Sequence, residues 1–280
     1  MMCKIALVTA ALSYRAEQNG DRVGRRQLSQ PRIAEMIADS LRRRILAGEL
    51  NDGDVLPKVD DLLLEFPVSK PSIREAMRIL ETEGLLSVRR GNVGGAVIHR
   101  PNAKVAAYML GMVLQAQDTP LEDLAAALSD CEPACAAKAA ELSLHDKSLV
   151  ATLTTLNEEL EAELADGPAF TRLARRFHDA VVQGCGNATL ALVAGSLETL
   201  WSNHESNWAE TTNAHGEYPN LPARESVLRT HVKITEAIEE GDAARARHLV
   251  AQHLQESQRY VLSQGAKQRI TVEGLSKAPW

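Results

Sequence analysis

The sequence is poor in aromatic residues. Phe, Trp and Tyr make up only 4% of its 280 residues, whereas hydrophobic residues as a whole make up 45%. All-β folds depend on aromatic and β-branched strand residues, so a composition rich in Ala, Leu and Glu favours helices. The length predicts about two domains, each able to bury a core without disulfides or a metal.

Cysteines and long apolar runs are also scarce. The four cysteines are irregularly spaced, which argues against a secreted disulfide scaffold. Cys131 and Cys135 are one helical turn apart and could share a metal, but no second pair accompanies them, so we expect small buried side chains.

No apolar run approaches the roughly 18 residues of a membrane span, which excludes an integral membrane protein. A short apolar stretch, Ile5 to Leu12, imitates a signal peptide only weakly, and we interpret residues 1–28 as a disordered or weakly ordered arm.

Basic charge is concentrated at the front of the chain. The net charge is −6, yet residues 1–100 contain 16 Lys and Arg against 13 Asp and Glu, a balance of +3. Residues 101–280 contain the remaining 15 basic and 24 acidic residues, a balance of −9. Only the front is therefore expected to meet a polyanion such as DNA.

Residues 29–100 show the pattern of a winged helix-turn-helix. The predicted elements are a helix over about 31–47, a short helix over 60–66, a helix from 69 to 83, and strands over 85–90 and 96–99. Gly48 and Gly84 stop helices, and Ser69 is a good N-cap. In such a motif the second helix enters the major groove of DNA, and the hairpin lies over the backbone or the minor groove.

The predicted second helix carries a stripe of positive charge. Lys70, Arg74 and Arg78 follow each other at intervals of four residues and share one face, where they can meet phosphates or guanine edges. A plain solvated helix face is the alternative. Hydroxyl and backbone N–H groups at the helix start favour a phosphate. The predicted DNA-binding residues are Lys58, Ser69, Lys70, Ser72, Arg74, Arg78, Arg89, Arg90 and Gly91.

The rest of the chain is predicted to be helical after a linker near His99–Asn102. The expected helices cover about 103–116, 120–142, 146–165, 168–184, 187–209, 223–240 and 242–264. A polar loop over 210–222 separates the fifth and sixth of them, and residues 265–280 read as a frayed tail. The fold class is mainly α: a winged helix-turn-helix with a small hairpin, then an all-helical bundle over 103–264.

Several segments resemble a known family. Gly53–Pro57, Val68–Met77 and Leu80–Leu85 resemble the GntR family of bacterial transcription regulators, and Phe177-His178, His231, Gly241-Asp242 and His253 resemble the FCD effector domain of its FadR subfamily. The resemblance covers about residues 30–264. It implies a cytoplasmic homodimer that binds an inverted-repeat DNA operator, most commonly as a repressor. A small-molecule effector, typically an organic acid, is implied to bind the helical domain and change operator affinity.

The resemblance also implies a metal. Many FCD domains hold one with an Asp and three His, and the three histidines match at His178, His231 and His253. The Asp position, four residues before the first His, is Ala174. Three neutral imidazoles can still hold Zn²⁺ or Ni²⁺ if water or a ligand completes the shell. Each histidine falls on an apolar helix face, so buried, hydrogen-bonded histidines without metal are the alternative.

Three other positions depart from the family pattern. An Arg usual on the short helix is Asp60, an acid that would repel phosphate, and Lys58 lies close enough in sequence to compensate. Lys70 stands where Arg is commoner, which changes how guanine is read. The Arg that often holds a carboxylate effector, four residues before a Glu such as Glu132, is Leu128. Either another cation serves, or the effector is less anionic, or the pocket has drifted.

Two other functions fit parts of the sequence. Ala174 and Leu128 are consistent with a regulator whose effector site is eroded and insensitive to ligand. A metal-dependent enzyme could use the three histidines to activate water. The sequence shows neither a nucleophile motif nor an evident general base beside them, so we expect no enzyme activity.

Overall fold

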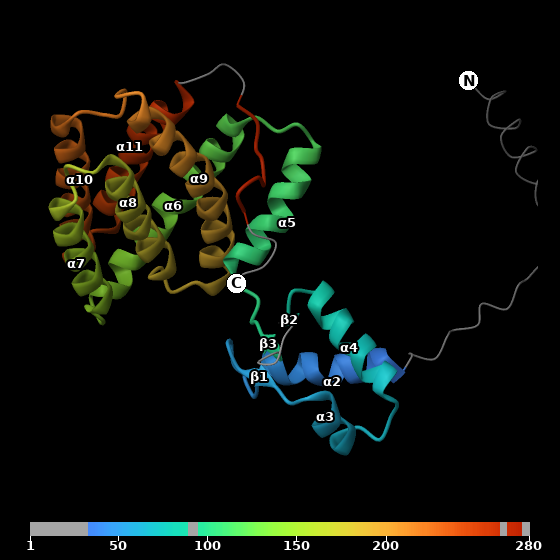
Figure 1. Cartoon of the computed structure of the whole chain (residues 1–280). Coiled ribbons are helices and arrows are strands. Elements are labelled where there is room, and N and C mark those ends of the chain that lie inside the picture. The colour runs from blue at the N-terminus through green and yellow to red at the C-terminus, as the bar shows by residue number, and fades with distance from the viewer. Residues whose placement is uncertain (1–32, 89–94, 264–267, 276–280) are drawn as a thin grey trace, which may run out of the picture.

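The structure is a computed structural model that describes residues 33–88, 95–263 and 268–275 (Figure 1). It is mainly helical, with one small sheet, as the sequence predicts. The arm predicted over residues 1–28 and the wing residues Arg89, Arg90 and Gly91 lie outside the described residues. Within the described ranges, no helix combines the length and the apolar character that crossing a membrane requires.

The first part is a helix-turn-helix with a three-stranded sheet. Its elements are α2 (Ile33–Ala47), β1 (Val55–Leu56), α3 (Val59–Glu65), α4 (Lys70–Thr82), β2 (Leu86–Val88) and β3 (Ala96–Ile98). β3 is the central strand and pairs antiparallel with both β1 and β2. The two-residue β1 was not predicted, because a strand this short shows no alternation.

The local sequence explains how α4 is oriented. The Ser69 side chain caps the helix by accepting a hydrogen bond from the Ser72 backbone N–H at 3.3 Å. Ile73, Ala76 and Leu80 are fully buried in the core that α4 shares with α2 and the sheet. Burying this stripe turns the opposite, charged face of α4 toward solvent.

The second part is a bundle of helices. Its elements are α5 (Ala103–Ala116), α6 (Leu121–Ser143), α7 (Ser148–Ala162), α8 (Gly167–Gln183), α9 (Ala188–Ala214), α10 (Leu221–Glu239) and α11 (Ala243–Leu262). α6 packs against α7, α8, α9, α10 and α11, and buried alanines such as Ala136 and Ala140 allow their close approach. The polar loop predicted over 210–222 is too long at both ends, because α9 continues to Ala214 and α10, capped by Asn220, begins two residues earlier than expected.

The C-terminal segment is not frayed over its described residues, 268–275. The Ile270 side chain is 1% exposed and packs with apolar residues of α5, α6 and α9. Its backbone N–H donates to the Thr119 carbonyl at 3.1 Å, and the Leu121 N–H donates to the Gln268 carbonyl at 2.9 Å. Figure 1 shows this red segment running past α5. The segment therefore fastens the start of α6 and the neighbouring helix α5 to the bundle.

This packing predicts a stabilising role for the C-terminal segment. Ile270→Ala is expected to lower the free energy of unfolding by about 2–5 kcal/mol, because it removes buried methyl groups and leaves a cavity. Chemical unfolding followed by circular dichroism measures the loss. Glu273→Ala, at an exposed position of the same segment, is the control and should be close to neutral. An unchanged midpoint for Ile270→Ala would show that the segment does not hold the bundle.

Candidate functional site

The three predicted histidines meet inside the bundle. His178 lies on α8, His231 on α10 and His253 on α11, and each side chain is buried. The Nε2 atom of His253 lies 3.1 Å from Nε2 of His231 and 3.2 Å from Nε2 of His178. The ring of Phe177 stacks on His231 with centroids 4.1 Å apart. Three nitrogens of one kind thus converge from three helices.

Burial keeps these imidazoles neutral. It lowers the pKa of His178 to about 3 and holds the pKa values of His231 and His253 well below the ordinary 6.5. The Nδ1 atom of His178 is hydrogen-bonded to the Glu132 carboxyl group on α6. When Nδ1–H donates to Glu132, the Nε2 of His178 keeps its lone pair and faces the other two histidines. The arrangement can therefore bind a cation without first releasing protons.

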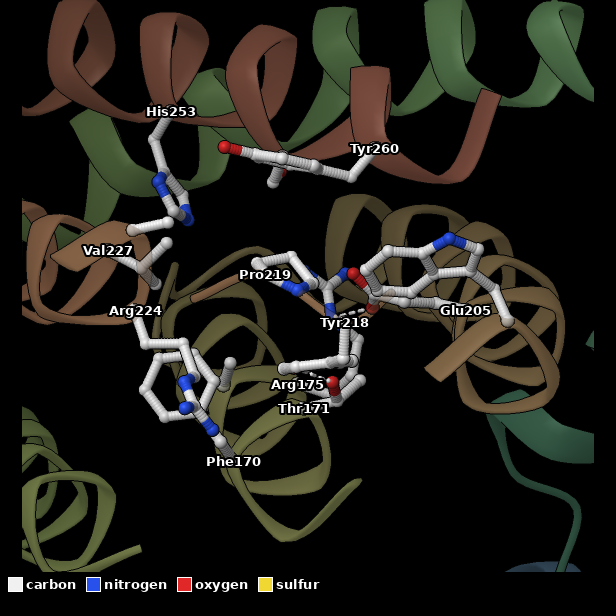
Figure 2. A pocket seen from close by; sticks show the side chains of 14 residues that line it. Phe170, Thr171, Arg175, Glu205, Tyr218, Pro219, Arg224, Val227, His253 and Tyr260 are labelled. Carbon is white, nitrogen blue, oxygen red and sulfur yellow. Dashed lines mark hydrogen bonds and ion pairs between the residues drawn. The ribbon is translucent and has the colours of Figure 1, made fainter. Parts of the chain in front are cut away.

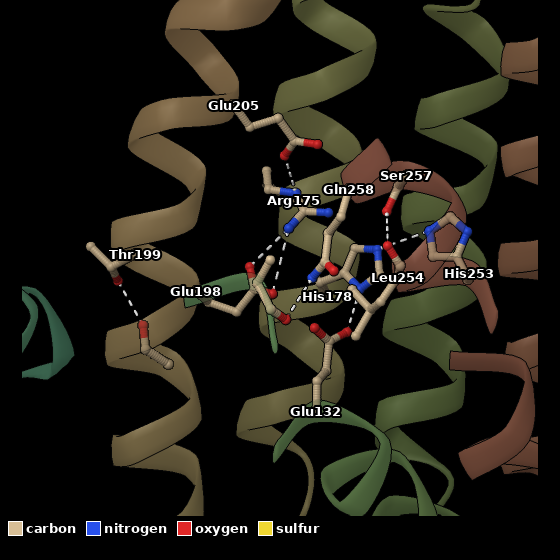
Figure 3. A network of polar contacts seen from close by, with 12 residues as sticks. Glu132, Arg175, His178, Glu198, Thr199, Glu205, His253, Leu254, Ser257 and Gln258 are labelled. Atoms are coloured by element: carbon tan, nitrogen blue, oxygen red, sulfur yellow. Dashed lines mark hydrogen bonds and ion pairs between the residues drawn. The ribbon is translucent and has the colours of Figure 1, made fainter. Parts of the chain in front are cut away.

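A buried ion-pair cluster borders the triad (Figure 3). The guanidinium of Arg175 on α8 lies 3.1 Å from a Glu198 carboxylate oxygen and 2.6 Å from one of Glu205, both on α9. All three side chains are buried, and Glu132 faces the same guanidinium. Burial raises the pKa of Glu132 to about 7 and of Glu198 to about 8, although the positive charge of Arg175 opposes the rise. The single positive charge of Arg175 therefore acts on three buried carboxyl groups.

Among the described residues, two sets of buried ligand atoms are close enough to hold a metal. The three histidines form one set, and Glu132, His178 and Glu198 form the other, with the ligand atoms of each set within 4.8 Å of one another. Arg175 already places a positive charge beside the carboxylates of the second set. Electrostatic repulsion by this guanidinium disfavours a second cation there. The histidine set is the better metal site.

A cavity leads from the surface to this site (Figure 2). It holds about 60 Å³, is lined by Arg175, Arg224, Tyr218, Tyr260 and His253 among others, and adjoins a groove of about 440 Å³ between α10 and α11. His253 lines both spaces. A ligand in the groove can therefore approach one of the three histidines.

The cavity also contains hydrogen-bond donors without partners. Among the described residues, the buried Nε of Arg224 and Nε1 of Trp208 have none. The Arg224 guanidinium lies 5.7 Å from the centre of the Tyr218 ring, and its Nη1 donates to the Ala165 carbonyl at 3.2 Å. Donors that are shielded from water and unpaired favour a ligand that brings acceptor oxygens.

The structure shows the surroundings of two residues that differ from the family pattern. Leu128 is fully buried in an apolar cluster with Leu200 and Trp201, so no effector contact arises from it. Ala174 lines the cavity, one residue before Arg175. Sequence reasoning missed Arg175 and Arg224. Arg175 precedes His178 by three residues, so the helical period could have placed both side chains on one face.

The predicted DNA-binding residues of α4 are brought together on its exposed face. Lys70 Nζ lies 2.6 Å from an Asp60 carboxylate oxygen, and Arg78 donates two hydrogen bonds of 3.1 Å to Glu75. Arg74 is exposed on this face, and its positive charge adds to that of Lys70 in lowering the pKa of Asp60. The hydroxyl groups of Ser69 and Ser72 are hydrogen-bonded to each other at 2.9 Å. The carboxylate of Asp60 is paired with Lys70, and the exposed Lys58 lies just before α3.

The ion-pair cluster predicts a pH-dependent loss of stability when its cation is removed. Arg175→Met should lower the free energy of unfolding by about 3–5 kcal/mol above pH 8, because buried carboxylates lose their partner. Since the pKa values of Glu132 and Glu198 are raised in the folded state, their protonated forms fit the interior, and the deficit should shrink as the pH falls through 8 and 7. Denaturation at several pH values measures it.

The neighbouring residue provides a matched control. Arg176 pairs with Glu159 on the surface, and Arg176→Met should cost less than about 1 kcal/mol at every pH. Equal, pH-independent losses in both variants would contradict the assigned role of Arg175.

Comparisons with known proteins agree with this organisation. The family model of the bacterial regulatory proteins of the gntR family matches residues 33–95, and the FCD domain model matches residues 123–256. The HTH-type transcriptional repressor NanR of Cronobacter sakazakii is 26% identical over 256 residues, which cover 84% of this chain and 87% of that protein. NanR of Salmonella schwarzengrund is 27% identical over 258 residues, covering 88% and 92%.

A solved structure shows the same fold. A GntR protein of Streptococcus agalactiae superposes with a TM-score of 0.61 at 24% identity, covering 81% of this chain and 99% of that one. The relatives are transcription regulators and not enzymes. The chain belongs to the GntR family of bacterial transcription regulators, with a winged helix-turn-helix followed by an FCD domain.

Proposed function

We propose that this protein is a cytoplasmic, homodimeric repressor of the FadR type. Its winged helix-turn-helix domains, residues 29–100, bind the two halves of an inverted-repeat operator. Its helical domain, residues 103–264, binds a small-molecule effector that changes operator affinity. The observation that carries the proposal is the cavity that reaches His253 in a chain that begins with a gntR DNA-binding domain.

Operator binding is assigned to the exposed face of α4 and the wing. The start of α4 offers the hydroxyl groups of Ser69 and Ser72 to a phosphate, and Lys58 lies just before α3. The remaining contacts are assigned to Lys70, Arg74, Arg78, Arg89, Arg90 and Gly91. Arg74 is exposed on this face, where its guanidinium can meet a base or a phosphate.

The DNA assignment is tested at Arg74. Arg74→Ala should weaken binding to the operator by about 5- to 150-fold, the loss expected for one good contact to a base. Fluorescence anisotropy with DNA from the flanking intergenic region measures it. Arg247→Ala removes an exposed Arg from α11 and is the control, with operator affinity expected to stay near that of the wild type. Equal, weak binding of wild type and Arg74→Ala to any DNA would refute operator recognition.

The histidine triad is proposed to hold one divalent metal, Zn²⁺ or Ni²⁺. The residues fit: three Nε2 atoms converge, and the Glu132 carboxyl group fixes the ring of His178. Ala174 cannot supply the carboxylate of the family pattern, and Glu132 brings negative charge through His178 instead. A metal here would supply a Lewis acid that attracts an oxygen atom of the effector.

The effector is proposed to be a small organic acid. The charge of Arg175 is taken up by Glu198 and Glu205, so it mainly shapes the cavity wall. Arg224 is the cation left to meet an anionic group, and the Nε1–H group of Trp208 is a further donor. The position of Arg224 supports the first of the three possibilities raised by Leu128, in which another cation binds the carboxylate of the effector.

A regulator with an eroded effector site is the second candidate. It is favoured by Ala174 and by Leu128, whose side chain belongs wholly to the apolar core. In that case the buried histidines only hydrogen-bond one another, and the protein would bind its operator regardless of metabolites. Metal content separates this candidate from the first.

Metal binding is tested on protein purified without a His tag. Mass spectrometry should find about one metal ion per chain after loading with Zn²⁺ or Ni²⁺ and dialysis, because three converging imidazoles suffice. His231→Ala should lose it. His248→Ala, at an exposed position of α11, should keep it. Failure of the wild type to retain either metal would exclude the metal site and support the eroded one.

A further inference from the structure

Asp60 and Lys70 join the two helices of the helix-turn-helix. Asp60 is the second residue of α3, Lys70 is the first residue of α4, and an Oδ1–Nζ distance of 2.6 Å links them. Both side chains remain open to solvent, with exposed fractions of 77% for Asp60 and 56% for Lys70. The Lys70 ammonium group holds the pKa of Asp60 below its ordinary value, so the carboxylate is ionised near neutral pH.

Fold stability does not explain this pair. Exposed ion pairs contribute only about 0–1 kcal/mol. A carboxylate beside a DNA-binding helix is also unfavourable, because DNA phosphates repel it and Lys70 loses part of its positive charge. A hydrogen-bond donor on the DNA would offset this repulsion.

The major groove offers such a donor only on some bases. Exocyclic amines that donate hydrogen bonds belong to cytosine N4 and adenine N6. In a G·C pair the cytosine amine lies next to the guanine O6 acceptor, and guanine N7 follows. The joined side chains present one acceptor and one cationic donor side by side, which is complementary to this edge.

We propose that Asp60 and Lys70 together read one G·C base pair in each half of the operator. Asp60 accepts a hydrogen bond from cytosine N4, while Lys70 donates to guanine O6 and N7. An A·T pair offers an amine next to an acceptor as well, but a thymine methyl group stands where Lys70 would meet N7. The inference rests on the proposed function and adds the base identity at one position.

The test is a selection from a pool of DNA duplexes with a randomised core. Wild type should enrich a G·C pair at one position of each half-site, and replacing that pair should weaken binding by about 5- to 150-fold. Asp60→Asn should move the preference at that position toward adenine, because an amide can bind adenine N6 and N7 together. The other positions should keep their preferences.

Asp61→Asn is the matched control. Asp61 is the next residue of α3, is exposed, and forms no ion pair in the described part of the chain, so the variant makes the same charge change without touching Lys70. Asp61→Asn should keep the wild-type base preference. If both variants only tighten binding to all sequences alike, Asp60 acts by charge alone and the inference is wrong, while operator binding stands. A wild type that enriches no sequence would overturn the proposed function itself.

Discussion

The polar interior of the FCD domain depends on one buried guanidinium. Arg175 binds Glu198 and Glu205, and it faces Glu132, which in turn holds the ring of His178. Charged groups are costly to bury unless they are paired and hydrogen-bonded. The cluster therefore fixes α6, α8 and α9 relative to one another, and with them the position of the first histidine and one wall of the cavity.

His178 separates two environments. Its Nδ1 atom faces carboxyl groups that are served by a guanidinium, and its Nε2 atom faces two neutral imidazoles. The first environment already contains a cation, whereas the second offers lone pairs and no charge. The difference between these two environments gives a physical reason why Ala174 can stand where the family usually has Asp. In the proposed metal site, negative charge from Glu132 would act on the metal through His178, and the cavity beside Ala174 would stay open for an effector.

The sequence predicts much of this architecture because its signals are local or periodic. The helix-turn-helix, the helices of the bundle and the inward faces of His178, His231 and His253 follow from caps, breakers and helical period. Contacts between distant segments are harder to predict. Ile270 lies with Val272 and Leu275 in a segment too short to show a periodic pattern, and nothing nearby in sequence shows that it packs against α5. The pairing of Asp60 with Lys70 spans a turn whose geometry only the structure gives. Arg175 reads as a surface residue until three carboxyl groups are found around it.

We propose that a metal lies on the Nε2 side of His178, whereas the guanidinium of Arg175 pairs with the carboxylates on its Nδ1 side. Anomalous diffraction at the zinc edge, from crystals of the zinc-loaded protein, tests it most directly. We expect one peak bounded by the Nε2 atoms of His178, His231 and His253, with Glu132 still hydrogen-bonded to Nδ1 of His178. A peak between Glu132 and Glu198, with Arg175 displaced, would contradict it.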